Sequence, residues 1–341
     1  MDQRSMRSVV ISGPQQIHIE KRSVPVPGVD EVMIRVEYVA ICGSDQSRFW
    51  DTSGTSQEPV VFGHEFSGRI VSAPGDMGLE AGQGVAVAPL FNCGNCEFCR
   101  AGKENMCPNR RRFGVNVDGA LQDFVCLPAD RVFRLPVQLS LVEGALIEPL
   151  AVAYHAVCQA GPTVGGSALV LGAGAIGLLI AQTWQAMGNG TVAIIDINDK
   201  RVAVAEQLGI PIYKKDPAES NFHTIFEATG SADAFSKWLP ALAPAGKVVI
   251  VSKLEDHVEI DWVNLLRKEG EIITSRYFTL ADFENSLDLV ATGKVLLKPL
   301  IGLIMPLHKL AENSGLEAMH LAKDAVRLVI HLQDQNEIVD E

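Results

Sequence analysis

Four cysteines that could share one metal ion are the clearest chemical signal in the sequence. Cys93, Cys96, Cys99 and Cys107 follow the spacing C-x2-C-x2-C-x7-C. Four thiolates on one loop are the usual ligands of a tetrahedral structural zinc ion, whereas a redox-active C-x-x-C pair needs only two. Disulfide bonds are an alternative, but residues 1–4 lead into no apolar run of the length of a secretion signal. We therefore predict a structural zinc ion, with no coordination position left for catalysis.

Four further residues carry side chains that could bind a second zinc ion. Taken alone, Cys42 is typical of a small buried hydrophobic residue, and His64 of an ordinary core or surface histidine. Glu65 and Glu148 are harder to explain, because a carboxylate is costly to bury without a partner and Glu148 lies inside an apolar run. One zinc ion would explain all four residues and leave a position for water or substrate. On these residues alone, the separate and the shared interpretation both remain open.

A glycine-rich turn predicts a dinucleotide site. The motif G-x-G-x-x-G begins at Gly172, directly after the apolar run 167–171 and before a segment of helical composition, 178–187. Asp196 ends the next apolar run, 19 positions after Gly177. Glycines in this context allow a tight turn and let a pyrophosphate approach a helix N-terminus. The residues predicted to bind the cofactor are Gly172, Gly174, Ala175, Ile176, Gly177, Asp196 and Arg201.

The acidic residue after this motif favours NAD over NADP. The carboxylate of Asp196 should accept hydrogen bonds from the adenosine ribose and repel a 2′-phosphate. Lys200 and Arg201 follow it closely and weaken this preference only slightly. We therefore predict NAD as the cofactor.

The elements that must position the zinc candidates are strands. Before about Ala156, short segments alternate between apolar and polar residues with period two, as half-buried strands do. One of these segments leads to Cys42, and another has the His64–Glu65 pair at its start. The predicted strands of this β-rich part are 8–11, 16–20, 31–39, 62–71, 82–89, 119–127 and 131–135.

The glycine motif belongs to a different kind of fold. After about Ala156, continuous apolar runs, typical of parallel strands buried on both faces, alternate with helical segments and predict a doubly wound sheet. Predicted strands are 167–171, 191–196, 224–228, 246–252 and a buried strand at 265–273, which leads into Ser275; predicted helices are 178–187, 233–242 and 280–292. Residues 294–341 return to a mixture of both. The predicted fold class is α/β, with a β-rich domain and a doubly wound parallel sheet.

Length, composition and charge exclude several function classes. A chain of 341 residues is long enough for two domains, and no apolar run reaches the ~20 residues of a membrane span. The net charge of −12 disfavours a nucleic-acid surface. The one basic run, 110–112, is typical of a solvated loop, with an anion or subunit contact as the alternative. Free cysteines beside a metal quartet favour a reducing compartment, so we expect a cytoplasmic protein without nucleic-acid or membrane partners.

The ordered set of motifs resembles the zinc-dependent medium-chain dehydrogenases, in the branch that acts on polyols such as sorbitol, on sugar phosphates such as galactitol 1-phosphate and on sugar acids. The resemblance runs almost end to end and rests on Cys42-Gly43-Ser44-Asp45, Gly63-His64-Glu65, the four-cysteine lobe, Glu148-Pro149-Leu150 and 171–177. It implies a GroES-like catalytic domain made of residues 1–154 and 292–341, with a Rossmann NAD-binding domain at 155–291. It also implies a homodimer or homotetramer.

The resemblance implies a role for each zinc candidate. Cys42 and His64 would be fixed ligands of a catalytic zinc ion, and Glu65 and Glu148 would share the remaining positions. Ser44 matches the hydroxyl that relays the substrate proton. Two zinc ions per chain are therefore expected, one in the cysteine lobe and one at this site.

The neighbours of these residues match the family in part. Asp45 would orient the zinc-binding histidine. The family often has another histidine shortly after this motif, where the proton relay ends, but Gln46 and Ser47 stand here instead. Arg276 and Tyr277 match the arginine–tyrosine pair that meets the polyol substrate in sorbitol-type enzymes.

The expected reaction transfers a hydride from a secondary alcohol of a polyol, sugar phosphate or sugar acid to NAD, giving a ketone. A threonine-type or simple alcohol dehydrogenase of the same fold is one alternative, and a non-catalytic zinc- and nucleotide-binding paralogue is another, which the intact set including Ser44 disfavours. We expect Arg276 to contact the far polar end of the substrate, because an arginine at the end of a buried strand needs an anion or several hydroxyl oxygens. Its pairing with Glu148 or another local acid is the alternative.

Overall fold

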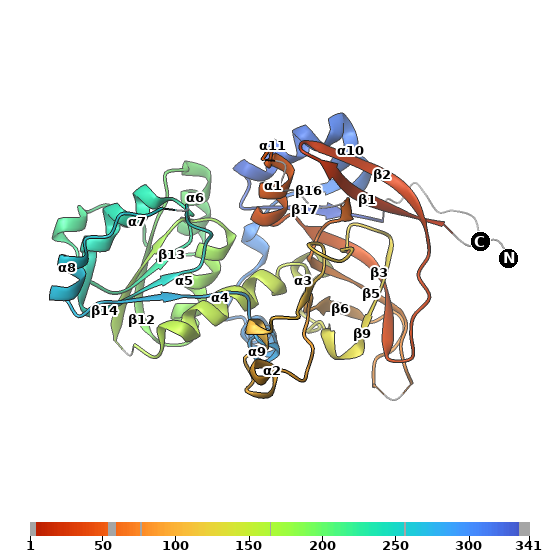
Figure 1. Cartoon of the computed structure of the whole chain (residues 1–341), viewed down its shortest axis with the longest axis horizontal. Coiled ribbons are helices and arrows are strands. Elements are labelled where there is room, and N and C mark those ends of the chain that lie inside the picture. The colour runs from red at the N-terminus through yellow and green to blue at the C-terminus, as the bar shows by residue number, and fades with distance from the viewer. Residues whose placement is uncertain (1–4, 54–58, 76, 164, 256, 334–341) are drawn as a thin grey trace. The chain divides into compact units, whose positions relative to one another are not determined.

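The chain forms two compact units. The computed structural model describes residues 5–53, 59–75, 77–163, 165–255 and 257–333. Unit 1 contains Met1–Glu148 and Ile301–Glu341, and unit 2 contains Pro149–Leu300. The chain therefore leaves unit 1, builds unit 2 from one continuous segment and returns to unit 1 (Figure 1). Each unit has a hydrophobic core of its own.

Unit 1 is β-rich, as the sequence predicts, and its strands pair mainly antiparallel. One sheet has the order β10-β6-β5-β3-β17-β16, with β9 also paired to β3, and a second has the order β2-β1-β4. Its longer strands are β1 (Ser5–Gly13), β2 (Gln16–Ser23), β3 (Glu31–Ala40), β5 (Glu65–Ser72), β6 (Gly84–Val87), β9 (Phe124–Pro128), β10 (Val132–Arg134), β16 (Ile301–Pro306) and β17 (Arg327–His331). β17 pairs with β3, so the C-terminal segment completes this sheet.

Two neighbouring strands of unit 1 bring distant residues together. β3 and β5 are antiparallel, with Ala40 opposite Glu65. The end of β3 therefore lies beside the start of β5, and the segment that carries Cys42 meets the segment that carries His64. Helix α1 (Gly43–Trp50) begins directly after Cys42, which is its N-cap. This helix is short and polar, and the sequence analysis does not predict it.

Short helices and small strands complete unit 1. The helices are α2 (Glu97–Arg100), α3 (Leu141–Gly144), α10 (Leu307–Ala311) and α11 (Leu316–Asp324), and the small strands are β4 (Val60–Val61), β7 (Leu90–Phe91) and β8 (Arg111–Arg112). β7 and β8 form an antiparallel ribbon, and the cysteine lobe is the segment of chain that connects them. α11 is tied to α1, where Gln46 Nε2 donates a hydrogen bond to the Ala322 carbonyl oxygen at 3.4 Å.

Unit 2 is the doubly wound sheet that the apolar runs predict. Its five strands are all parallel and have the order β12-β11-β13-β14-β15. A parallel bridge between Ile194 and Ile212 extends the sheet beyond β12. From β11 the chain adds β12 on one side of the sheet and then β13 on the other, so the strand order reverses between β11 and β13. Folds of this kind bind ligands at such a point, at the carboxyl ends of the strands. The strands are β11 (Gly166–Leu171), β12 (Gly190–Ile195), β13 (Phe222–Glu227), β14 (Leu242–Ile250) and β15 (Glu271–Thr274).

The helices of unit 2 follow the predicted alternation. They are α4 (Ile147–Ala160), which starts at the boundary of the units, α5 (Ala175–Ala186), α6 (Asp199–Gln207), α7 (Ala232–Trp238), α8 (Trp262–Arg267) and α9 (Leu280–Ala291). α4 and α9 are joined by a buried contact, in which His155 Nδ1 lies 2.8 Å from Asp282 Oδ2. Asp282 also accepts a hydrogen bond from the Thr279 backbone N–H and so caps α9. None of the described helices is long and apolar enough to cross a membrane.

Two predicted strands differ from the structure. The segment 119–127 forms a regular strand only from Phe124, because Ala120 and Leu121 donate their N–H groups to the carbonyl oxygens of Gly63 and Phe62 instead. The strand before Ser275 is β15, the edge strand of its sheet, and it is not fully buried. It is shorter than the apolar pattern suggests, because the residues before it form α8.

Candidate functional site

The cysteine lobe has the geometry of a zinc site. Cys93, Cys96, Cys99 and Cys107 are free thiols whose sulfur atoms lie within 4.8 Å of one another. The Sγ–Sγ distances are 3.9 Å for Cys93–Cys99, 3.5 Å for Cys96–Cys99 and 3.6 Å for Cys93–Cys107. A tetrahedral zinc ion with Zn–S distances of about 2.3 Å would place its ligand sulfurs about 3.8 Å apart. The four cysteines therefore fit a zinc ion, and the distances are too long for disulfide bonds.

Backbone groups in the lobe favour thiolates. The Cys99 N–H points to Cys96 Sγ, and the Cys93 N–H points to Cys107 Sγ, both at 3.5 Å. The N–H groups of Asn95 and Cys96 lower the pKa of Cys93 to about 6, whereas burial and the neighbouring sulfurs raise the pKa of Cys99 to about 12. Several thiolates this close together repel one another, so the full quartet is ionised only with a cation between them.

Three of the four residues predicted to bind the second zinc ion meet in unit 1. Cys42, His64 and Glu65 each bring one ligand atom within 4.8 Å of those of the other two. Asp45, on the first turn of α1, lies behind them: its Oδ1 is 3.7 Å from His64 Nδ1, and its Oδ2 accepts the Cys42 N–H at 3.0 Å. Asp45 is therefore placed to orient the imidazole and to hold the start of α1. Ser44 is exposed on the same turn.

Glu65 has a partner that the sequence analysis does not identify. Arg327, the first residue of β17, donates from Nη2 to Glu65 Oε1 at 2.7 Å, and both side chains are buried. Among the described residues, no hydrogen-bond partner reaches the buried Glu65 Oε2. Oε2 is therefore the atom available to a metal ion. Glu148 lies outside the close group of three, but its charge interacts with those of His64 and Glu65.

The site carries more potential negative charge than positive charge. Asp45, Glu65 and Glu148 are 3%, 1% and 8% exposed. Burial raises the pKa of Glu148 to about 8 and also raises the pKa values of Asp45 and Glu65. Burial would lower the pKa of His64, but the charges of Asp45 and Cys42 outweigh it and raise that pKa well above its ordinary value.

These shifts fit a divalent cation. Three buried carboxyl groups and the Cys42 thiol face one histidine and Arg327, so full ionisation leaves an excess of negative charge in a poorly solvated place. A thiolate, an imidazole and a carboxylate are a donor set that zinc accepts, with one position open. The residues present therefore fit a catalytic rather than a structural zinc site.

The glycine motif forms the expected turn in unit 2. Gly172 has a φ of +100°, and a Cβ on Gly177 would overlap the Gly172 carbonyl oxygen, so the strand and helix α5 approach more closely than a side chain allows. Nothing lies within 4 Å of the Cβ position of Gly174, the N-cap of α5. The open N-terminus of an apolar helix fits a pyrophosphate.

Asp196 lies beside this turn and supports it. Its Oδ2 accepts the Ala173 N–H at 2.7 Å, and its Oδ1 accepts the Asn198 N–H at 2.8 Å. Arg201 Nη1 is 3.9 Å from Oδ2. Asp196 therefore supports the turn in addition to the role predicted for it, and Arg201 lies beside its carboxylate.

A second acidic residue shapes the neighbouring strand end, and the sequence analysis does not identify it. Glu227, the last residue of β13, is completely buried. Its Oε1 accepts the N–H groups of Thr229 at 2.7 Å and Gly230 at 3.0 Å, and its Oε2 accepts the Ser252 hydroxyl. Glu227 thus joins the loops after β13 and β14, and the loop after β13 borders the Gly172 turn. An acid at a strand end carries no sequence motif of its own.

Arg276 differs from its expected setting. It is exposed, because it follows the edge strand β15, so the argument from the cost of burial does not apply. Its guanidinium lies over the Tyr277 ring at 4.9 Å, and Nη2 donates to the Tyr277 hydroxyl at 3.3 Å. Both residues belong to unit 2.

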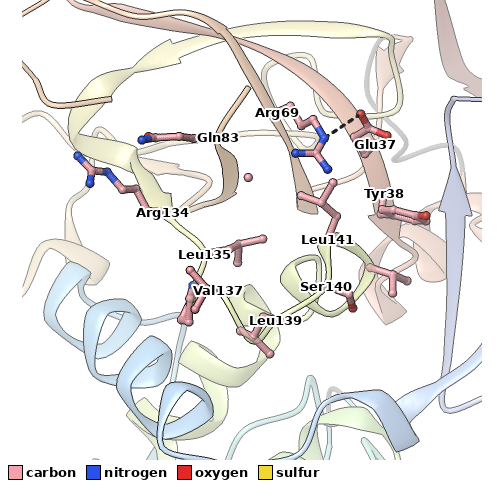
Figure 2. A pocket seen from close by; sticks show the side chains of 13 residues that line it. Glu37, Tyr38, Arg69, Gln83, Arg134, Leu135, Val137, Leu139, Ser140 and Leu141 are labelled. Atoms are coloured by element: carbon pink, nitrogen blue, oxygen red, sulfur yellow. Dashed lines mark ion pairs between the residues drawn. The ribbon is translucent and has the colours of Figure 1, made fainter. Parts of the chain in front are cut away.

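One hollow of unit 1 lies apart from this site. A hollow of about 760 Å³ in unit 1 is lined by Tyr38, Arg69, Arg134 and the leucines around α3 (Figure 2). Figure 2 shows Arg69 turned toward Glu37, with which it forms an ion pair, on the side opposite Arg134. The hollow contains none of the predicted zinc or cofactor residues.

Comparison with known proteins agrees with this geometry. Residues 28–137 match the family model of the alcohol dehydrogenase GroES-like domain, and residues 175–292 match that of the zinc-binding dehydrogenases. The chain is 30% identical to a sorbitol dehydrogenase of Bombyx mori, over 96% of this chain and 99% of the relative. It is 30% identical to 2-dehydro-3-deoxy-L-galactonate 5-dehydrogenase of Pseudoalteromonas atlantica, over 86% of this chain and 90% of the relative.

Solved structures extend the similarity to the whole fold. Galactitol-1-phosphate dehydrogenase from Escherichia coli superimposes with a TM-score of 0.85 at 25% identity, covering 96% of this chain and all of that one. A structure from Sinorhizobium meliloti 1021 with bound NADP superimposes with a TM-score of 0.88 at 28% identity, covering 97% of this chain and all of that one.

Proposed function

The chain belongs to the zinc-dependent medium-chain dehydrogenases, and from this premise we propose that it oxidises a secondary alcohol of a polyol, sugar phosphate or sugar acid to a ketone, with hydride transfer to NAD. The meeting of Cys42, His64 and Glu65 at the start of α1 is the observation that carries this proposal. Relatives named for a polyol, a sugar acid and a sugar phosphate support the substrate class.

The residues around this cluster supply the parts that the reaction needs. A zinc ion on Cys42, His64 and Glu65 would lower the pKa of a substrate hydroxyl, so that an alkoxide forms near neutral pH. The hydroxyl of Ser44, exposed on the first turn of α1, would relay the proton, accepting it from the substrate while passing its own proton to solvent. Asp45 Oδ1 lies 3.7 Å from His64 Nδ1, so its charge faces that side of the ring and Nε2 would be the nitrogen that binds the metal. Glu148 adds a second carboxylate whose raised pKa lets it ionise when a cation is near.

Several further properties belong to the proposal. A second zinc ion in the cysteine lobe gives two per chain. We assign residues 1–154 and 292–341 to the catalytic domain and 155–291 to the NAD-binding domain. The protein is a homodimer or homotetramer in the cytoplasm, where a reducing environment keeps the thiols free.

The cofactor preference gives a first prediction. Asp196→Asn should lower the ratio of kcat/KM for NAD to kcat/KM for NADP by on the order of 10-fold, because it removes the charge that repels the 2′-phosphate. The amide oxygen can still accept the Ala173 N–H that supports the glycine turn, although the hydrogen bond from the Asn198 N–H is lost. Steady-state kinetics with both cofactors measures the ratio.

A matched control is available on the next helix. Asp199→Asn removes the same charge from an exposed position on the first turn of α6, and the ratio should stay at the wild-type value. Equal kcat/KM values for NAD and NADP in the wild type would contradict the NAD preference, and an unchanged ratio in Asp196→Asn would contradict the role of this residue.

A substrate panel tests the proposed function itself. Hexitols, hexitol phosphates, aldonates and short simple alcohols should be compared in NAD-linked oxidation by zinc-loaded protein. We expect at least one member of the first three classes to have a kcat/KM far above that of every simple alcohol. A preference for simple alcohols or for threonine would favour the related activities of the same fold, and no oxidation of any alcohol would contradict the proposal.

A further inference from the structure

Arg48 lies on the helix that carries the proposed proton acceptor. It follows Ser44 by four positions on α1, and residues four apart on a helix lie on the same face, with Cβ atoms about 5–6 Å apart. Because α1 starts at Cys42, the first turn brings Ser44 to the zinc cluster and the second turn brings Arg48 next to it. A substrate whose hydroxyl is activated beside Ser44 therefore extends past Arg48 if it continues along this face.

The guanidinium of Arg48 is hydrogen-bonded to the loop that contains Gly114 and Val115. Its Nη1 donates to the Val115 carbonyl oxygen at 3.1 Å. The preceding residue, Gly114, packs so closely on the backbone before His64 that a Cβ would lie 2.6 Å from the Gly63 carbonyl oxygen. The guanidinium thus lies between helix α1, which follows Cys42, and the loop at Gly114, which packs beside His64.

This arginine is also partly removed from water. Its side chain is half-buried, and burial lowers its pKa although the charge of Asp45 acts in the opposite direction. Asp45 is itself engaged by the Cys42 N–H and lies beside His64. A guanidinium presents a planar fork of N–H donors that matches a carboxylate or a phosphate, and partial burial strengthens such a contact.

We propose that Arg48 binds the anionic group of the substrate, and that the protein acts on a sugar acid or sugar phosphate in preference to a neutral polyol. This inference rests on the proposed function and narrows its substrate class to sugar derivatives that carry an oxyanion. Arg48 and the zinc candidates all belong to unit 1, so their relative positions do not depend on how the two units are arranged. Arg276, the arginine expected to make this contact, is an exposed residue of the other unit.

The test compares matched substrates on matched variants. For wild type and Arg48→Gln, kcat/KM is measured with a hexitol, with its monophosphate and with the corresponding aldonate. The ratio of the anionic to the neutral value should fall by about 10- to 100-fold in Arg48→Gln, as expected for loss of a charge-assisted hydrogen bond. Arg48→Lys should lie in between, because it keeps the charge but not the fork. The anion whose ratio falls more identifies the group that Arg48 recognises.

A control and a binding measurement separate the possible failures. Arg111→Gln removes the same charge from an exposed position on β8 and should leave the ratio unchanged. The inference is wrong if the ratio in Arg48→Gln matches that control.

If no alcohol is oxidised, the binding of the three compounds to zinc-loaded protein is measured by calorimetry. Tighter binding of hexitol monophosphate or aldonate than of hexitol, with the difference abolished in Arg48→Gln, supports the role of Arg48 although the proposed reaction fails. Equal binding of charged and neutral compounds overturns it.

Discussion

Replacing Cys42 by alanine should lower kcat/KM for every alcohol substrate by on the order of 10³-fold, because activation of the hydroxyl by zinc contributes several kcal/mol. The variant keeps His64 and Glu65, but one oxygen of Glu65 is already bonded to Arg327. Without the thiolate, His64, Glu65 and the more distant Glu148 should not retain the ion. Metal analysis should therefore show one zinc ion per chain in Cys42→Ala and two in the wild type, with the remaining ion in the cysteine lobe.

The chain offers a control for this substitution. Cys126 is a free cysteine of unit 1 on β9, outside both ligand groups. Cys126→Ala makes the same chemical change and should keep both metal ions and nearly all activity. Retention of two zinc ions and of normal kcat/KM in Cys42→Ala would show that Cys42 is the small buried residue that its isolated context suggests.

Replacing Arg327 by methionine should have the largest effect on stability. Arg327 and Glu65 are 9% and 1% exposed in their side chains, and loss of one partner of a buried ion pair costs about 3–5 kcal/mol. The variant leaves the Glu65 carboxylate without its cation close to two further buried acids, Asp45 and Glu148. Chemical denaturation followed by circular dichroism should show this loss in the free energy of unfolding.

A double variant and an exposed pair test the reason for the effect. Adding Glu65→Gln to Arg327→Met removes the unpaired charge and should restore at least part of the lost stability. Lys309→Met breaks an exposed ion pair with Glu312 and should cost less than about 1 kcal/mol. If Arg327→Met costs no more than Lys309→Met, the pair does not stabilise the buried site.

Features that depend on neighbouring residues could be predicted from the sequence. The cysteine lobe is complete within fifteen residues, and the glycine turn, its strand and its helix are continuous in the chain. Period-two alternation predicts β2 and β3, and continuous apolar runs predict β11, β12 and β13. The two fold types and the family follow from these local patterns, and the family models and the doubly wound sheet confirm them.

Features that depend on the pairing of distant segments could not be predicted in this way. Arg327 and Glu65 are 262 positions apart, and they meet because β17 and β5 both pair with β3. Arg276 was expected at a buried strand, but the position of β15 at the sheet edge is a property of strand order and not of its own residues. Arg48 carries no motif, although its spacing of four from Ser44 would have placed it on the same face once a helix was assumed.

Removal and return of zinc is the most direct test of the central claim, that the Cys42–His64–Glu65 cluster binds the zinc ion used in alcohol oxidation. The protein is depleted with a chelator, and NAD-linked oxidation of its best substrate is measured while zinc is added back to known content. We predict that activity falls when the zinc ion at Cys42, His64 and Glu65 is removed. Activity should then rise in proportion to the zinc content as that content increases from one to two ions per chain. Full activity in metal-free protein, or full recovery in Cys42→Ala, would contradict it.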